Sequence, residues 1–457
     1  VLLLAVPGSG KTTVLVTRLG YMIYCKNIPP ERILTVTYTV AATKDMSERF
    51  AVRFGEDMAK RLEFRTINGI CARIIQYYGR RIGKTPFELV KDEKATTGML
   101  IRICQDHGMG YPTESDLKNV RTLITYIKNM MLNEEELQKL EEESDIRIAG
   151  IYREYCRQMR EQKLMDYDDQ MLYAYNMLRK DPGVLAYFQN RYPYICVDEA
   201  QDTSKIQHAI IALLAAGTGN LFMVGDVKQS IYRFRLSRPE LFMGKYNSYS
   251  TQESSRQRID LDRNFRSRGE VLDSTNYIFR KLMRKEFGEI IYDDKAALHL
   301  GASFPELPDE NVFTDQTELL LYDQTGLRSS EAREEEARMI AQRMKELLNT
   351  GVVLDKETGE YRPVHYRDMV ILTRSLQGWA EVFASILAEE GIPAYSVSRE
   401  GYFGTYEVSV LLDYLKVLDN ARQDLPLTAV LTSPFAGLTA AELSVIRLAY
   451  PNQLFYE

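Results

Sequence analysis

The chain opens with a short apolar run that passes directly into a glycine-rich turn: Val1-Leu2-Leu3-Leu4-Ala5-Val6-Pro7-Gly8-Ser9-Gly10-Lys11-Thr12-Thr13. The apolar residues predict a buried strand, and the stretch from Thr12 to Tyr24 predicts a helix. A strand that turns through glycines into a helix presents backbone N–H groups and the positive end of the helix dipole to an anion. The stretch therefore predicts a loop that binds the phosphates of a nucleotide, in a protein of the α/β class.

Each residue type in this loop suits that chemistry. Gly8 and Gly10 let the backbone approach phosphate with no Cβ in the way. Lys11 can reach the β- and γ-phosphates of ATP, and the Thr12 hydroxyl suits Mg²⁺. The strict phosphate-loop pattern begins with Gly, whereas this chain has Ala in that place. We expect ATP and Mg²⁺ to be bound here by Ala5, Gly8, Ser9, Gly10, Lys11, Thr12 and Thr13.

Composition narrows the class of protein. The 457 residues suffice for several domains, and 45% hydrophobic with 27% charged residues is typical of a globular protein. Five scattered cysteines without C-x-x-C spacing favour a reducing compartment, such as the bacterial cytoplasm, over disulfides or a zinc site. The net charge is −6, yet residues 228–285 carry 14 Lys and Arg against 6 Asp and Glu. That stretch predicts either a localised phosphate-contacting surface or an ordinary solvated helix face.

Three further apolar runs predict strands, at Ile33–Tyr38, Tyr194–Asp198 and Leu221–Gly225. Helical patterns lie between them, which predicts a doubly wound parallel sheet whose ligand sites lie at the carboxyl ends of the strands. Between residues 80 and 165 the pattern is helical, including Asp116–Met131 and Ile146–Lys163, and we expect an inserted helical domain there.

A second α/β region is expected from residue 261 to 400. Its predicted helices and strands are, respectively, Glu270–Lys285, Ser330–Leu348 and Gly378–Glu390, and Glu318–Asp323, Met369–Thr373 and Pro393–Val397. The stretch 300–315 predicts a loop, and 351–363 predicts either a loop or a small hairpin around Thr358-Gly359. From residue 402 the pattern is helical again, at Tyr406–Asn420 and Ala440–Ala449.

Polar residues follow two of the predicted strands. Asp198 can hold Mg²⁺, and the adjacent Glu199 can orient and deprotonate an attacking water. Gln229, just past the strand that ends at Gly225, can sense the γ-phosphate. Arg266 can stabilise charge on the transferring phosphoryl group, although the sequence alone is equally compatible with a surface cation.

Aromatic and basic residues alternate after Gln229. Tyr232 and Phe234 lie among Arg233, Arg235 and Arg238. Aromatic rings stack on bases and guanidinium groups meet phosphates, so the run suits single-stranded nucleic acid. The alternative is that both aromatic residues belong to an ordinary core.

These four elements, in this order and spacing, resemble motifs I to IV of superfamily 1 helicases of the UvrD/Rep/PcrA type. Motif I of that family characteristically starts with Ala, which accounts for Ala5. The stretches 35–46 and 64–68 resemble motifs Ia and Ib, and 165–169 resembles the segment that returns from the helical insertion. Within the family, the wording of residues 225–235 and 264–273 is most similar to the AddA branch of the helicase–nucleases.

The resemblance implies two RecA-like domains, each with an insertion: 1–79 with 166–260 (domain 1A), 80–165 (1B), 261–400 (2A, partial) and 401–457 (start of 2B). It implies an ATP site built from Lys11, Thr12, Asp198, Glu199, Gln229 and Arg266, with Thr12 and Asp198 on the metal. It also implies a path for single-stranded DNA lined by Thr37, Thr39, Thr66, Asn68, Tyr232 and Phe234. Departures at Val40, Asn68 and Ala200 would alter DNA contacts and leave the ATP chemistry intact.

The resemblance further implies ATP-driven movement 3′ to 5′ on single-stranded DNA in double-strand-break repair, with an AddB-like partner subunit. The Q motif, motifs V and VI and a nuclease motif are not found, so we expect an internal piece of a longer protein with weak or no hydrolysis alone. Two alternatives stay open. One is a UvrD/PcrA-like repair helicase without a nuclease partner, which the short insertion favours; the other is a DNA-binding module with little ATPase activity. A small-molecule kinase would leave the aromatic-basic run without a role.

Overall fold

The computed structural model describes residues 1–92, 94–144, 146–230, 236–284, 291–307, 316–355, 358–376, 378–396, 406–450 and 453–456. The chain divides into two compact units, each of which is described by itself. Unit 1 comprises Val1–Phe304 with Asp315–Thr317, and unit 2 comprises Pro305–Thr314 with Glu318–Glu457. The predicted domain boundaries are finer than this division and stay predictions.

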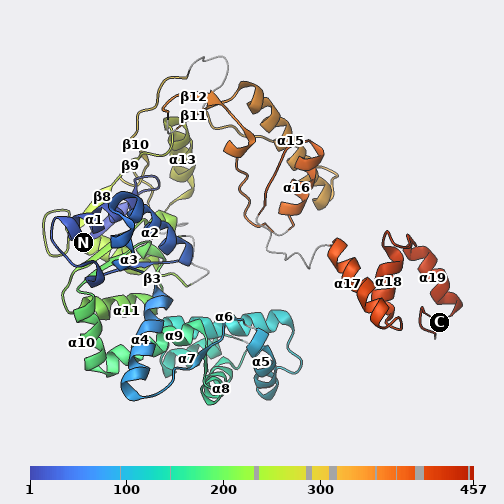
Figure 1. The fold of residues 1–457 in the computed structure, drawn as a ribbon, viewed down its shortest axis with the longest axis horizontal. Coiled ribbons are helices and arrows are strands. Elements are labelled where there is room, and N and C mark those ends of the chain that lie inside the picture. Colours follow the sequence, from blue (N-terminus) through green and yellow to red (C-terminus); the bar gives the residue numbers. More distant parts are fainter. Residues whose placement is uncertain are drawn as a thin grey trace. The chain divides into compact units, whose positions relative to one another are not determined.

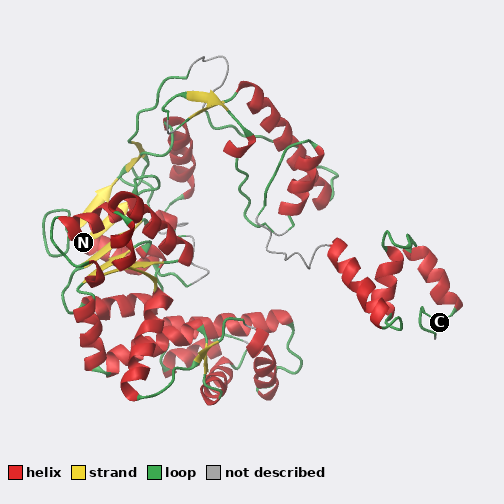
Figure 2. Ribbon diagram, in the orientation of Figure 1, coloured by secondary structure: helices red, strands yellow, loops and turns green. Residues whose placement is uncertain are grey.

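Unit 1 is built on a six-stranded sheet in the order β3-β2-β6-β7-β1-β8, with every neighbouring pair parallel (Figure 2). Four strands lie where the sequence predicts them, and β3 and β8 add one strand at each edge. A parallel, doubly wound sheet is therefore confirmed. The strands are β1 (Leu2–Ala5), β2 (Ile33–Thr37), β3 (Glu63–Thr66), β6 (Tyr194–Val197), β7 (Leu221–Gly225) and β8 (Arg258–Leu261).

Helices cover both faces of this sheet, because successive strand residues point to opposite sides. Leu3 packs in one core cluster with residues of α1 (Lys11–Tyr24), α2 (Val40–Phe54) and α3 (Glu56–Arg61). Its neighbour Leu2 packs in the other cluster. The helices of that second face are α4 (Ile67–Ile82), α9 (Tyr167–Lys180), α10 (Pro182–Arg191) and α11 (Lys205–Ala215), joined by α12 (Pro239–Ser248) through Phe242 (Figure 1).

The expected helical insertion is present, with a core cluster of its own. Its helices are α5 (Lys94–Asp106), α6 (Glu114–Met130), α7 (Glu134–Glu142) and α8 (Ile148–Glu161). Two short strands, β4 (Glu88–Leu89) and β5 (Leu164–Met165), pair in parallel at its base. The sequence predicts no strand here because two residues are too few to show a periodic pattern.

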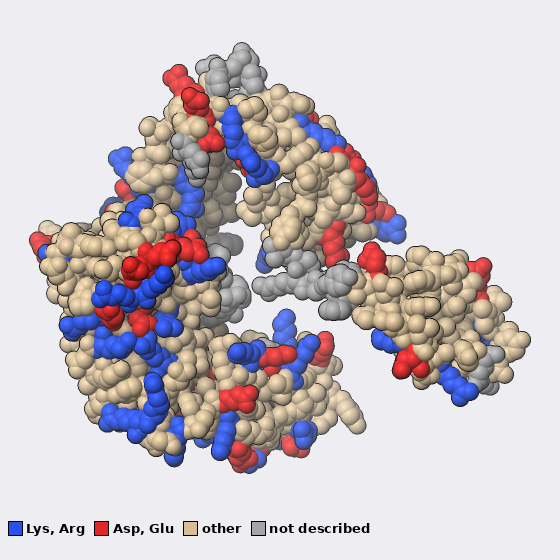
Figure 3. Space-filling model, viewed as in Figure 1, with Lys and Arg blue, Asp and Glu red and all other residues tan. Residues whose placement is uncertain are grey.

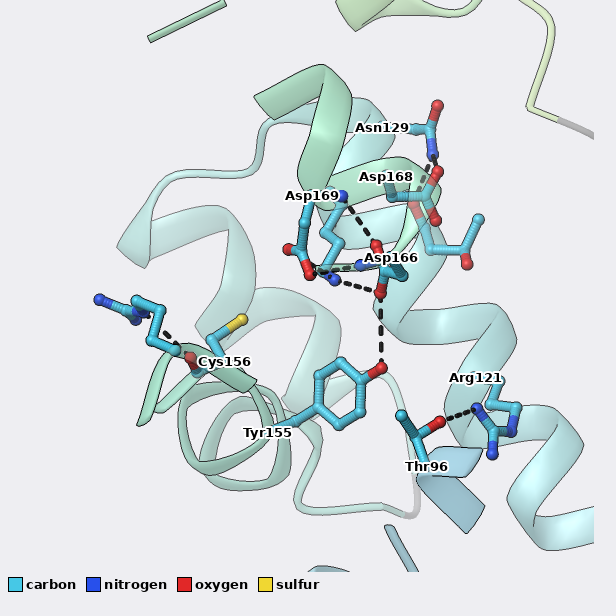
Figure 4. Close-up of polar contacts among 11 residues, drawn as sticks. Thr96, Arg121, Asn129, Tyr155, Cys156, Asp166, Asp168 and Asp169 are labelled. Carbon is cyan, nitrogen blue, oxygen red and sulfur yellow. Dashed lines mark hydrogen bonds and ion pairs between the residues drawn. The ribbon is translucent and has the colours of Figure 1, made fainter. Parts of the chain in front are cut away.

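A buried ion cluster joins the insertion to the sheet domain. The Lys128 side chain on α6 is fully buried, and its Nζ lies 2.6 Å from Asp166 Oδ2 and 2.7 Å from Asp169 Oδ1 at the start of α9. Tyr155 of α8 donates a 3.4 Å hydrogen bond to Asp166, and Asn129 donates a 2.8 Å bond to Asp168 (Figure 4). Burial would lower the pKa of Lys128, but the two carboxylates outweigh it and raise that pKa.

The chain after β8 stays with unit 1. The two-residue strands β9 (Arg263–Asn264) and β10 (His299–Leu300) pair in parallel, and α13 (Gly269–Leu282) packs near them, within the range predicted for a helix. Leu272 of α13 and Leu298 form a small core cluster with Val6 of the phosphate loop. This segment therefore lies directly against the first strand and the loop that follows it.

Unit 2 contains the predicted helices but not the predicted strands. Its helices are α15 (Ser329–Thr350), α16 (Ala380–Glu389), α17 (Tyr406–Asp419), α18 (Asp424–Thr432) and α19 (Ala440–Ala449). The hairpin alternative is confirmed, since β11 (Val352–Leu354) and β12 (Tyr361–Pro363) pair antiparallel around the turn at residues 358–359.

The strand predictions at Glu318–Asp323 and Met369–Thr373 are wrong, as is the described part of Pro393–Val397, whose last residue lies outside the described residues. Leu321 is 80% exposed and Leu372 is 90% exposed. A strand needs a hydrogen-bonded neighbour, and within the described part of unit 2 none of these three segments has one. Residues 301–307 are loop as expected, and 308–315 lie outside the described residues.

Candidate functional site

The phosphate loop has the backbone conformation that the sequence predicts. Gly8 and Gly10 both take left-handed conformations, with φ of 74° and 84°, and Gly10 is the residue that precedes α1. The Ser9 hydroxyl donates a 2.7 Å hydrogen bond to the Val6 carbonyl, and its backbone N–H donates to the same oxygen at 3.1 Å. The loop is thus held in a tight turn at the carboxyl end of β1, with the first N–H groups of α1 free of side-chain caps.

Lys11 lies at the start of α1 and contacts a residue 218 positions away. Its Nζ donates a 2.9 Å hydrogen bond to Gln229 Oε1, and Gln229 in turn donates a 2.9 Å bond to Asp226 Oδ2. Burial lowers the pKa of Lys11, opposed by the carboxylates of Asp226 and Asp198. The structure therefore brings together Lys11 and Gln229, two of the predicted ATP-site residues.

Asp198 and Glu199 follow β6 at the same edge of the sheet. Glu199 has a left-handed backbone, with φ of 51°, and its N–H donates a 3.0 Å bond to the Asp198 carboxylate. Burial, together with the charge of Glu199, raises the pKa of Asp198 to about 6. A non-glycine residue at positive φ is uncommon and is concentrated at functional sites, so the conformation of Glu199 agrees with a role in chemistry.

A second layer of polar side chains supports these residues. Asp226 is fully buried, and its backbone N–H donates a 3.1 Å bond to Gln201 Oε1. Gln201 also donates to Asp202, which accepts a 3.4 Å bond from Ser230. Burial and then Glu199 raise the pKa of Asp202 to about 6. In the sequence, Gln201, Asp202 and Asp226 stand out only as parts of motifs; their position directly after a strand or the Asp-Glu pair is the signal that could have identified them.

The Arg266 loop lies on the phosphate loop. The N–H of Phe265 donates a 2.9 Å bond to the Gly8 carbonyl, and Asn264 Nδ2 donates a 2.8 Å bond to the Pro7 carbonyl. Arg266 itself is exposed, and its backbone N–H donates a 2.8 Å bond to Asn264 Oδ1. The loop that carries Arg266 is therefore placed at the nucleotide site, and Asn264 is a residue of this site to which the sequence alone assigned no role.

The residues present fit a magnesium ion shared with phosphate. Mg²⁺ in nucleotide sites takes one or two protein oxygens and completes its shell with phosphates and water. The described residues contain no cluster of three or more His, Cys, Asp or Glu able to hold a metal alone. Asp198, whose described hydrogen bonds come only from the N–H of Glu199, offers a desolvated carboxylate, and Thr12 offers a hydroxyl one residue after Lys11.

The predicted DNA-contacting residues lie at the same edge, over β2 and β3. Thr37 and Thr66 are register partners on these two strands. Thr39 and Thr66 are the N-caps of α2 and α4, where their hydroxyls accept bonds from Ala42 and Gly69, each at 3.1 Å. Tyr232 and Phe234 lie outside the described residues, so the structure does not place them.

Asn68 lies on the first turn of α4, and its Oδ1 is buried with no hydrogen-bond partner among the described residues. Val40, the first residue of α2, is 75% exposed. Both positions depart from the residues common in the family, and both lie where an extended ligand along the sheet edge would pass.

Comparison with known families decides what this arrangement belongs to. Residues 1–250 match the family model of the UvrD/REP helicase N-terminal domain. The chain belongs to the UvrD/Rep helicase family. Residues 259–454 match the model of the UvrD-like helicase C-terminal domain, so the family likeness extends into unit 2. The P-loop fold class and the predicted family are confirmed.

Individual relatives are named as the AddA chain of an ATP-dependent helicase/nuclease, which confirms the resemblance to the AddA branch. The chain is 42% identical over 332 residues to that of Lachnoclostridium phytofermentans, covering 63% of this chain and 24% of the relative. It is 47% identical over 289 residues to that of Bacillus cytotoxicus, covering 61% and 23%, and 43% identical over 317 residues to that of Bacillus velezensis, covering 65% and 25%. The chain thus spans about a quarter of the length of these relatives.

The described helices also bear on membrane insertion. In the part of the chain that the structure describes, no helix combines the length and the apolar character that a membrane-spanning segment requires.

Proposed function

We propose that this chain is the ATP-binding and DNA-contacting part of an ATP-dependent DNA helicase that moves 3′ to 5′ on single-stranded DNA. The observation that carries the proposal is the convergence of Lys11, Gln229, Asp198 and Glu199 at one end of the parallel sheet. The pKa of Lys11 is affected by Asp198 and Glu199, which means that these charges lie close together around one site. Phosphoryl transfer requires this combination of a phosphate-binding cation, a metal-binding carboxylate and a water-orienting base.

Each residue has a separate role in this proposal. Lys11 binds the β- and γ-phosphates, and Mg²⁺, held by Thr12 and Asp198, neutralises charge on the phosphates. Glu199 orients and accepts a proton from the attacking water. Gln229 now occupies the Lys11 ammonium, so a γ-phosphate that takes its place frees the Gln229 side chain and the loop that follows it.

The DNA path follows from the geometry of β2 and β3. The N-termini of α2 and α4 lie at the carboxyl ends of neighbouring strands, where their N–H groups favour phosphate. Positive charge surrounds this edge of the sheet, because Arg65, Arg73 and Arg191 all pair with the single carboxylate of Glu63. Figure 3 shows Lys and Arg side chains along the face of unit 1 that carries β3 and α4. A phosphate backbone is the partner that such a surface attracts.

The biological setting is proposed from the relatives. Their printed name joins helicase and nuclease activity, which favours a role in double-strand-break repair and recombination over a UvrD/PcrA-like repair helicase without a nuclease partner. We accordingly propose a bacterial cytoplasmic location and an AddB-like partner subunit. Hydrolysis by these 457 residues alone is proposed to be weak.

The proposal is tested by binding of a fluorescent, non-hydrolysable ATP analogue to the chain in the presence of Mg²⁺. Lys11→Ala should weaken binding by at least about tenfold, since it removes the phosphate-loop cation that reaches the phosphates. Lys60→Ala is the matched control, because Lys60 is 71% exposed on α3 and should leave binding unchanged. Equal affinity in the wild-type chain and Lys11→Ala would contradict the proposal, and DNA binding without any nucleotide binding would favour the DNA-binding module instead.

A further inference from the structure

The link between the phosphate loop and the Arg266 loop passes through one side chain, that of Asn264. This residue is 3% exposed and lies in the two-residue strand β9. Its Nδ2 donates a 2.8 Å hydrogen bond to the Pro7 carbonyl, across 257 residues of sequence. Its Oδ1 accepts two bonds of 2.8 Å, from the backbone N–H groups of Arg266 and Ser267. The same carboxamide therefore holds both loops at once.

The two loops fit together closely at this point. A Cβ built on Gly8 would lie 2.5 Å from Asn264 Nδ2, which is closer than atoms can approach. The N–H of Phe265 adds a 2.9 Å bond to the Gly8 carbonyl, and Val6 packs with Leu272 beyond the loop. A displacement of the Pro7–Gly8 backbone, such as phosphate binding imposes, is thus transmitted to the backbone of Arg266.

We propose that Asn264 is a positioning residue that couples nucleotide binding at the phosphate loop to the placement of Arg266. This inference rests on the proposed ATP function and adds a route by which the bound nucleotide orders the arginine. Asn is suited to the task because it carries a donor and two acceptor lone pairs on one short, rigid group. Asp at this position would keep the acceptors and lose the donor, so it separates the two halves of the link.

The test is hydrogen–deuterium exchange of the whole chain, read at residues 5–13 and 262–268, with and without the Mg²⁺ complex of a non-hydrolysable ATP analogue. In the wild-type chain the analogue should slow exchange in both segments. In Asn264→Ala it should slow exchange only in residues 5–13. Without nucleotide, exchange of the N–H groups of Arg266 and Ser267 should be faster by about fivefold or more, since each loses a hydrogen bond.

Asn276 supplies the matched control. It is also buried, and its side chain likewise holds two chain segments together, through bonds of 2.9 Å to the N–H and the carbonyl of Leu298 and 2.8 Å to the Tyr292 hydroxyl. Asn276→Ala should cost comparable stability and leave the coupling between residues 5–13 and 262–268 as in the wild-type chain. Asn264→Asp should keep Arg266 and Ser267 protected without nucleotide but lose the coupling, and it guards against misfolding of the alanine variant.

Retained coupling in Asn264→Ala, or loss of coupling in Asn276→Ala to the same extent, would overturn the inference. If the analogue slows neither segment in the wild-type chain, the proposed ATP function fails on its own. The link is then judged by the exchange rates without nucleotide: faster exchange of residues 262–268 in Asn264→Ala than in Asn276→Ala supports it, and equal rates refute it.

Discussion

Replacing Lys128 by Met should destabilise the junction between the helical insertion and the sheet domain more than any exposed substitution on the same helix. Lys128 Nζ lies within 2.7 Å of carboxylate oxygens of both Asp166 and Asp169, and it lies 5.1 Å from the centre of the Tyr155 ring. At an effective dielectric constant of about 20, each ion contact contributes about 6 kcal/mol of gross attraction. Most of this offsets the cost of burying three charges, and removing the cation alone leaves two uncompensated carboxylates, at a net cost of about 3–5 kcal/mol.

The loss should depend on pH. Burial already raises the pKa of Asp169 to about 6, although Lys128 opposes the rise, and removing Lys128 raises it further. A carboxyl group whose folded pKa exceeds its unfolded value of about 3.9 contributes stability below that value and loses it as pH rises through the folded pKa. The deficit of Lys128→Met relative to the wild-type chain should therefore be larger at pH 8 than at pH 5.

The assay is urea unfolding followed by far-UV circular dichroism, with hydrogen exchange of α6, α8 and α9 to localise the effect. Lys118→Met on α6 is the matched control, because Lys118 is exposed and should change stability by less than about 0.5 kcal/mol. Adding Asp169→Asn to Lys128→Met should restore part of the loss, since one buried charge disappears. A difference below about 1 kcal/mol between Lys128→Met and Lys118→Met would refute the reasoning.

Three further outcomes follow from single sites. Gly8→Ala should abolish binding of the ATP analogue, because Gly8 has a φ of 74° and its Cβ would collide with Asn264; unchanged affinity would contradict this geometry. His208→Gln should flatten the rise in stability between about pH 4 and 6.5, because burial and then Lys245 lower the pKa of His208 to about 4, so protonating this histidine favours the unfolded chain as pH falls; identical pH profiles in urea unfolding would count against it. Thr39→Ala should destabilise by about 1 kcal/mol through loss of the α2 N-cap while Thr39→Ser does not, and equal unfolding midpoints for the two would exclude a capping role.

The part of the fold that sequence predicts best is the part fixed by local pattern. Runs such as Leu221–Gly225 are buried on both faces and bounded by polar turns, so their identity as strands does not depend on a particular neighbour. The segment Met369–Thr373 has a similar composition but no partner strand in the described part of unit 2, and it remains exposed. Pairing is a long-range property, which is why the same pattern predicted one segment correctly and not the other.

The site divides in the same way. Lys11 and Asp198 could be predicted because strand-then-polar-residue is a local signal whose position the sheet topology makes functional. Asn264 could not, because its role depends on Pro7, which lies 257 residues away. Lys128 is likewise one lysine among many in the sequence, and only the approach of α9 to α6 shows that it is buried between carboxylates. The roles assigned to the individual ATP-site and DNA-site residues stay predictions until binding is measured.

The most direct test of the central claim is the linkage between nucleotide and DNA binding on this chain. The affinity for the ATP analogue is measured with Mg²⁺ across a titration of single-stranded DNA, and the affinity for DNA is measured across a titration of analogue. The account predicts that saturating DNA changes the analogue affinity by about fivefold or more, and that the analogue changes the DNA affinity by the same factor, because the two sites share one edge of the sheet. Two affinities that are each independent of the other ligand would contradict it.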